Sequence, residues 1–181
     1  MNLAEKDLLL KFGKVIALML QGLCALVGAG CVLSILLVIL VTQGLLTDLL
    51  APDGIPETIA ASPPAFVSIP VAIAANLTVM FVFFGKMRAL IESVGKGDPF
   101  IPENAQRLNA MAWLILGAKV LAEIVGWLRI YLASLMDPEA ASTFDFSLYD
   151  LHSFLIVLVL FILARVFRHG AAMREDLEGT V

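Results

Sequence analysis

Charged residues interrupt an apolar run that extends from about residue 108 to residue 132. Lys119 and Glu123 lie near its middle, and each would cost at least a few kcal/mol if the run crossed a membrane. They are four residues apart, so a helix places them on one face, where the charges can pair. Asn76 occupies a comparable depth in an earlier apolar run. Two interpretations are open. The residues could form a proton or ion relay or a ligand site at the middle of the bilayer, or they could be an ion pair that fixes helix orientation.

Other patterns that carry chemistry are missing from the sequence. It has no Gly-rich phosphate loop, no spacing of Cys and His typical of a metal site, and no Ser, His and Asp constellation of an intramembrane hydrolase. Cys24 and Cys31 are two helical turns, roughly 10 Å, apart, too far for a disulfide within one helix. We therefore expect a protein that is not an enzyme and has neither a cofactor nor a metal.

The elements that must hold these residues are membrane spans. The chain has 181 residues, of which 60% are hydrophobic and only 15% charged, and a soluble protein of this size cannot bury so much apolar surface. The 27 residues from Val15 to Val41 carry no charge and form a run too long for a signal peptide. Apolar runs predict four spans, at about 15–41, 65–85, 108–132 and 151–167.

The basic residues predict the direction of the spans. Ten of the twelve Lys and Arg residues precede the first span, lie between the second and third, or follow the fourth. The other two connections, about 42–64 and 133–150, contain acidic residues but no Lys or Arg. Because short loops rich in Lys and Arg stay in the cytoplasm, we expect both termini, the loop 86–107 and the tail 168–181 to be cytoplasmic in a multi-pass membrane protein.

Span lengths and short connections favour an all-α fold, a single four-helix membrane domain over residues 1–181 arranged as an antiparallel up-down bundle. Ala118, Ala122 and Gly126 repeat every four residues, a pattern that lets helices approach closely. Such a seam can lie within one chain or between copies, so a homo-oligomer is an open possibility.

The loop 86–107 has more specific features than a tether needs. The helix of the second span is expected to continue past the membrane and stop at Gly95, Lys96 and Gly97, with Pro102 opening the third helix. Asp98 can cap a turn that has Pro99 at its first position. Phe100 is a candidate anchor, at the headgroups or in the pocket of a partner protein.

The tail 168–181 begins basic and ends acidic. An acidic segment with a terminal apolar residue and a free carboxylate can be captured by a partner. Our candidates for partner binding are therefore found in the loop and the tail: Asp98, Pro99, Phe100, Asn104, Glu175, Asp176 and Val181. The simpler interpretation is that both segments cap helices and contact lipid headgroups.

Both segments also carry a family resemblance. The turn from Gly97 to Phe100, followed by Asn104 and Leu108, and the tail with Phe167, Gly170, Glu175, Asp176, Gly179, Thr180 and Val181 resemble a bacterial membrane family of unknown function, the DUF 2975 family. The resemblance implies four hydrophobic helices, a place in a bacterial inner membrane and no established catalytic activity. It also implies a genomic context, because members are often encoded beside a small helix-turn-helix regulator.

Three functions follow as hypotheses. The first is a sensor or regulator, without nucleic-acid binding of its own, that acts on a small cytoplasmic helix-turn-helix DNA-binding partner. The second is a small transporter or channel subunit that uses Lys119 and Glu123. The third is a structural accessory subunit of a larger membrane complex.

Overall fold

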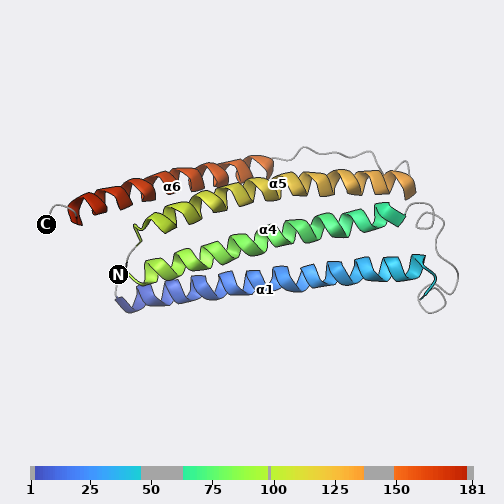
Figure 1. The fold of residues 1–181 in the computed structure, drawn as a ribbon, viewed down its shortest axis with the longest axis horizontal. Coiled ribbons are helices and arrows are strands. Elements are labelled where there is room, and N and C mark those ends of the chain that lie inside the picture. The colour runs from blue at the N-terminus through green and yellow to red at the C-terminus, as the bar shows by residue number, and fades with distance from the viewer. Residues whose placement is uncertain (1–2, 46–62, 98, 137–148, 179–181) are drawn as a thin grey trace. The chain divides into compact units, whose positions relative to one another are not determined.

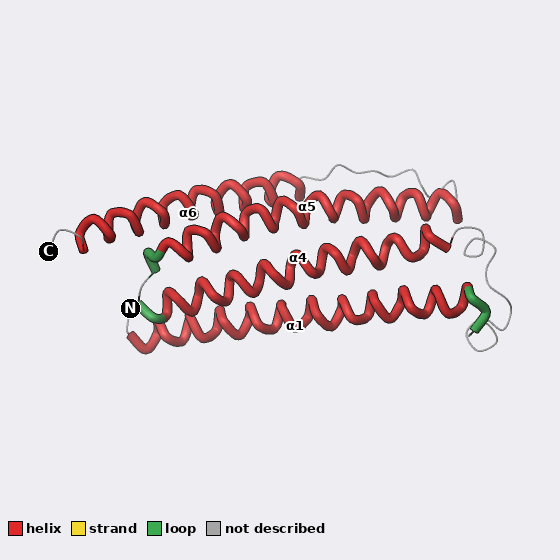
Figure 2. Tube along the Cα trace, in the orientation of Figure 1, coloured by secondary structure: helices red, strands yellow, loops and turns green. Residues whose placement is uncertain are grey.

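The computed structural model describes residues 3–45, 63–97, 99–136 and 149–178. The regular structure in these ranges is helical: α1 (Leu3–Thr42), α4 (Pro63–Gly95), α5 (Pro102–Met136) and α6 (Tyr149–Glu178) (Figures 1 and 2). Each helix is long and apolar enough to cross a membrane, so the predicted all-α fold with four membrane-length helices is confirmed. Even α6, with 30 residues, is about 45 Å long and exceeds the roughly 30 Å hydrocarbon core.

Proline and glycine mark the helix ends near the loop 86–107. As predicted, α4 ends at Gly95 and α5 opens at Pro102 with Glu103 in its first turn. Gly97 has a φ of 90°, a left-handed conformation that glycine adopts without a steric penalty. Its N–H donates a hydrogen bond to the Val94 carbonyl. Asp98, the predicted cap, lies outside the described residues.

The chain divides into two compact units. One comprises Met1–Cys24, Val79–Ala118 and Ser147–Val181. It contains ten of the twelve Lys and Arg residues, and we call it the basic unit. The second unit comprises Ala25–Thr78 and Lys119–Phe146. The ten basic residues that the charge pattern predicts to be cytoplasmic therefore lie in one unit.

Within the basic unit, successive helices are antiparallel. In each pair of neighbouring helices, the later a residue lies in the first helix, the earlier its contact lies in the second helix. For α1 and α4 the contacts are Lys14 with Glu92 and Gln21 with Phe81. For α4 and α5 they are Ser93 with Asn104 and Ala89 with Arg107. For α5 and α6 they are Phe100, just before α5, with Phe167, and Trp113 with Phe161. The up-down order predicted from short connections is therefore confirmed for this unit.

Most of the buried apolar residues of the basic unit lie on the inner faces of α5 and α6, and Ala17 of α1 is also fully buried. Buried residues recur on α5 at the spacing of one helical face, and on α6 every seventh residue is buried. They are Ala105, Leu108, Met111 and Ala112 on α5, and Val157, Ala164 and Ala171 on α6. Most are small, and small side chains let membrane helices approach closely.

The second unit contains the end of α1, which stops at a glycine. Gly44 has a φ of 78°, and its N–H donates to the Val41 carbonyl while the Leu45 N–H donates to the Leu40 carbonyl. This pair of bonds is the Schellman motif, which satisfies carbonyls left open at a helix end. The chain therefore leaves α1 in a defined turn before the acidic connection.

Candidate functional site

The two charges near the middle of the third apolar run form an ion pair within the second unit. Lys119 Nζ lies 3.4 Å from Glu123 Oε1, one helical turn along α5. The Lys119 side chain is 23% exposed and that of Glu123 is 52% exposed. Asn76 lies half-buried on α4 of the same unit. The close pairing of opposite charges lowers the cost of placing either in lipid.

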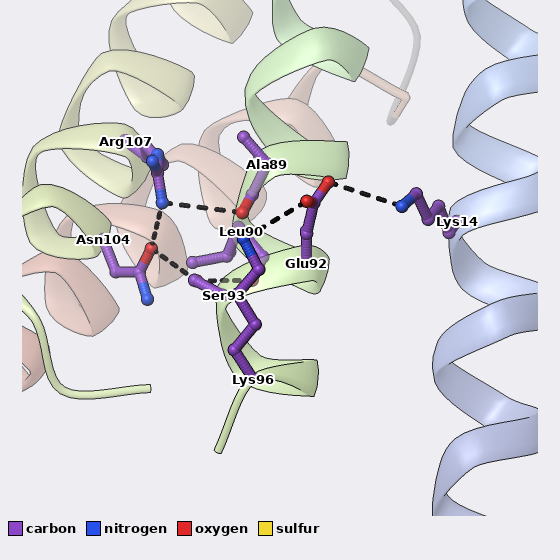
Figure 3. Close-up of polar contacts among 8 residues, drawn as sticks. All are labelled: Lys14, Ala89, Leu90, Glu92, Ser93, Lys96, Asn104 and Arg107. Carbon is purple, nitrogen blue, oxygen red and sulfur yellow. Dashed lines mark hydrogen bonds and ion pairs between the residues drawn. The ribbon is translucent and has the colours of Figure 1, made fainter. Parts of the chain in front are cut away.

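The most elaborate polar site joins α4 and α5 at the turn in the basic unit (Figure 3). Asn104 lies at its centre and is fully buried. Its Oδ1 accepts hydrogen bonds from Ser93 Oγ at 2.8 Å and from Arg107 Nη1 at 2.7 Å. Its Nδ2 donates to the Pro99 carbonyl at 2.9 Å. One amide side chain therefore ties the last turn of α4, the connecting turn and α5 together.

Arg107 extends this cluster back to α4. The same Nη1 atom lies 3.5 Å from the Ala89 carbonyl. The sequence pattern used Arg107 only as one of the basic residues that predict membrane topology, and it did not indicate Ser93. Their positions relative to Asn104 were the available signal: Arg107 follows it by three residues, about one helical turn, and Ser93 lies in the last turn of the preceding helix.

The burial of Asn104 changes its candidate role. A side chain with no exposed surface and three hydrogen-bond partners cannot also contact another protein. Pro99, another candidate, contributes its carbonyl to the same cluster. The Asn104 amide and the Pro99 carbonyl therefore stabilise the turn and do not form an exposed binding surface.

Phe100 packs against α6. Its ring centroid lies 5.2 Å from that of Phe167, and the ring lies over Gly170, where an added Cβ would come within 2.7 Å of Phe100 Cδ1. Phe100 nevertheless remains 42% exposed. One face of this ring thus anchors the turn on α6, while the rest of the ring is exposed.

A charged bridge links α1 to the end of α4. Glu92 Oε2 lies 3.4 Å from Lys14 Nζ, and Glu92 Oε1 lies 3.4 Å from Lys96 Nζ (Figure 3). Nearby, Gln21 Nε2 donates to the Phe81 carbonyl at 3.4 Å and lies over Gly85. Lys14 and Gln21 therefore connect α1 with α4 inside the basic unit, while the pair of Lys96 and Glu92 is local to the end of α4.

The acidic tail is part of α6, which continues to Glu178. Glu175 and Asp176 are exposed on its last turns. Met173 and Leu177, four residues apart, are 55% and 71% exposed. Val181 lies outside the described residues. Two exposed apolar residues and two exposed acids therefore share the final turns of this helix.

No group of three or more His, Cys, Asp or Glu side chains is placed to hold a metal ion within the described ranges. The arrangement of the site residues is one of ion pairs, an amide-centred turn and an exposed helix end. These features hold helices in place and offer a surface for binding.

Comparison with known proteins gives one match. A family model described as a protein of unknown function (DUF2975) matches residues 57–181. The matched residues include the whole of α4, α5 and α6 and exclude α1, so the likeness covers less of the chain than the sequence resemblance implied. No curated protein and no solved structure matches the chain.

Proposed function

This chain belongs to the DUF2975 family, and we propose that it is a non-enzymatic, multi-pass protein of the bacterial inner membrane that regulates a small cytoplasmic helix-turn-helix DNA-binding partner. The observation that carries the proposal is the exposed end of α6. It presents Met173 and Leu177 beside Glu175 and Asp176. This helix end is the surface to which we assign the partner.

Spacing puts the two apolar residues on one side of the helix. Residues four apart lie one above the other along a helix, so Met173 and Leu177 form a short apolar stripe. An amphipathic helix that lays such a stripe into a groove is a recurring mode of recognition. Asp176 lies beside the stripe and would meet the rim of that groove. Glu175 lies on the opposite side of the helix and adds negative charge to the same helix end.

Charge favours a DNA-binding protein as the occupant. Such proteins have basic surfaces that contact phosphate, and complementary charge speeds association and selects partners. Glu175 and Asp176 offer negative charge at an end of the chain otherwise rich in Lys and Arg. A regulator held through its basic surface by these acids would be kept from DNA.

The length of α6 supports the accessibility of this surface. Since the helix is about 15 Å longer than the hydrocarbon core, its last turns can project from the membrane. The basic residues Arg165, Arg168 and Arg174 favour the cytoplasmic side for that end. A cytoplasmic protein would then reach Glu175 and Asp176.

Co-purification tests the proposal. The full-length chain, expressed with the helix-turn-helix regulator encoded beside its gene, is solubilised in mild detergent and isolated by affinity. We expect the regulator to co-elute, and Asp176→Lys to reduce its recovery by roughly fivefold or more, as expected for loss of a charge pair at an interface.

Glu103→Lys is the matched control, because it reverses another exposed acid of the basic unit that lies on α5. It should leave recovery unchanged. Absence of any complex, together with unchanged transcription of the regulator's targets after deletion of the membrane protein, would sink the proposal.

A further inference from the structure

A hollow of about 570 Å³ lies between α5 and α6 in the basic unit. Its polar lining comes from Arg165, Arg168 and His169 of α6 and from Asn109 of α5. Its apolar lining includes Phe161 and Ala164. Neither the family description nor the proposed partner surface accounts for this combination of two arginines, a histidine and an amide.

The cationic groups suit a phosphate-bearing ligand. An arginine guanidinium presents a planar fork of N–H donors that matches phosphate and carboxylate oxygens. Arg165 and Arg168 are three residues apart, so both can reach one anion from the same side of the helix. Asn109 adds an amide donor from the opposite helix. The hollow therefore offers donors from two helices to one anionic group.

An apolar stripe leads along α6 into the hollow. Leu158 and Ile162 are 54% and 53% exposed, and they precede Arg165 by seven and three residues. These three residues and His169 follow the spacing of one helical face. Exposed apolar side chains on a membrane helix contact acyl chains. The stripe and the hollow thus match a molecule with a hydrocarbon tail and an anionic head.

The apolar end of the hollow is held in position. Phe161 makes an edge-to-face contact with Trp113 of α5, with ring centroids 5.6 Å apart, and Ala164 is buried beside it. These contacts fix the separation of the two helices at the point where the hollow begins. The hollow is consequently part of the packed α5–α6 pair.

We propose that this hollow binds the headgroup of an anionic phospholipid, with Arg165 and Arg168 contacting its phosphate and an acyl chain lying along Leu158 and Ile162. Basic pockets between membrane helices on the cytoplasmic side are known sites for such headgroups. A free phosphate ion shares the head chemistry but makes no use of the apolar stripe.

Native mass spectrometry of the full-length protein in neutral detergent tests the proposal. Phosphatidylglycerol and phosphatidylcholine with identical acyl chains are titrated separately. Phosphatidylglycerol should be retained roughly tenfold more tightly, and Arg165→Gln or Arg168→Gln should remove most of that preference, in line with loss of one charge-assisted contact. Arg174→Gln, on the same helix but outside the hollow's lining, is the matched control and should retain it.

Two further arms keep the outcome decisive. Ala172 also lines the hollow. Ala172→Phe fills the hollow without changing its charge, so it should weaken phosphatidylglycerol retention even if an arginine variant proves unstable. Inorganic phosphate in millimolar excess should leave the bound lipid in place. Equal retention of both lipids, an equal loss in Arg174→Gln, or displacement of lipid by phosphate alone would overturn the proposal.

Discussion

The ring of Phe100 lies directly over Gly170, so close that a Cβ at residue 170 would come within 2.7 Å of the ring. The contact joins the turn between α4 and α5 to the C-terminal third of α6. The ring also packs on Phe167, one helical turn earlier. A glycine is required at this position because any side chain would push the ring away.

Gly170→Ala is therefore expected to destabilise the protein. Real Cβ atoms do not approach other atoms so closely, and relieving such overpacking costs about 1–3 kcal/mol. The measurement is thermal unfolding in detergent, followed by circular dichroism. Gly117→Ala is the control, since a Cβ there meets no other side chain within 4 Å; it should leave the melting temperature unchanged or raise it, because Ala favours helix.

Asn104→Leu should also lower stability. It leaves the Pro99 carbonyl, Ser93 and Arg107 without the amide they contact, and each buried polar group left unsatisfied costs about 1–3 kcal/mol. Gln106→Leu, two residues away on an exposed position, should have little effect in the same melting experiment. Equal stability of the two variants would contradict the role assigned to Asn104.

The bridge from Lys14 to Glu92 and Lys96 should matter far less. These side chains are between 43% and 75% exposed, and exposed ion pairs contribute little because water and salt screen them. We expect Glu92→Gln to produce no resolvable change in melting temperature at physiological salt. A clear loss of stability that persists in high salt would show that this bridge is shielded from solvent.

The intramembrane pair predicts a pattern across three variants. Lys119→Met and Glu123→Gln each remove one partner of an ion pair with a 3.4 Å separation, and an unpaired charge in a membrane costs a few kcal/mol. The double variant Lys119→Met/Glu123→Leu removes both charges and should be more stable than either single variant. The measurement is the fraction of each variant protein that still elutes as a single monodisperse peak in size-exclusion chromatography after heating.

The same variants address transport. If the pair serves orientation alone, proteoliposomes containing the double variant should show the same ion and proton flux as those containing the unchanged protein. A flux present with the unchanged protein and lost in the double variant would favour the transporter hypothesis instead.

The sequence was sufficient to predict helices because long apolar runs have few folded alternatives in lipid. The end of α4 near Gly95 and the start of α5 at Pro102 were likewise predictable, since glycine and proline impose local backbone limits. Pairing of Lys119 with Glu123 followed from their spacing on one helix. All of these inferences depend on residues close together in the chain.

Contacts between distant residues were not predictable in this way. Phe100 was expected at headgroups or in a partner's pocket, yet one face of its ring packs on Gly170, 70 residues away. Nothing local to Asn104 indicated full burial, which depends on Ser93 of the preceding helix and on the packing of α5. The hollow beside Arg165 likewise depends on how α5 and α6 approach each other.

The partner and lipid proposals both require the basic unit to face the cytoplasm. Reporter fusions measure this directly. Alkaline phosphatase is active only outside the cytoplasm, and green fluorescent protein fluoresces in the cytoplasm but not after export as an unfolded chain. Each reporter is fused after residue 53, residue 97, residue 142 and the last residue. The account predicts phosphatase activity at 53 and 142, and fluorescence at 97 and at the C-terminus. Phosphatase activity at the C-terminus or at residue 97 would contradict it.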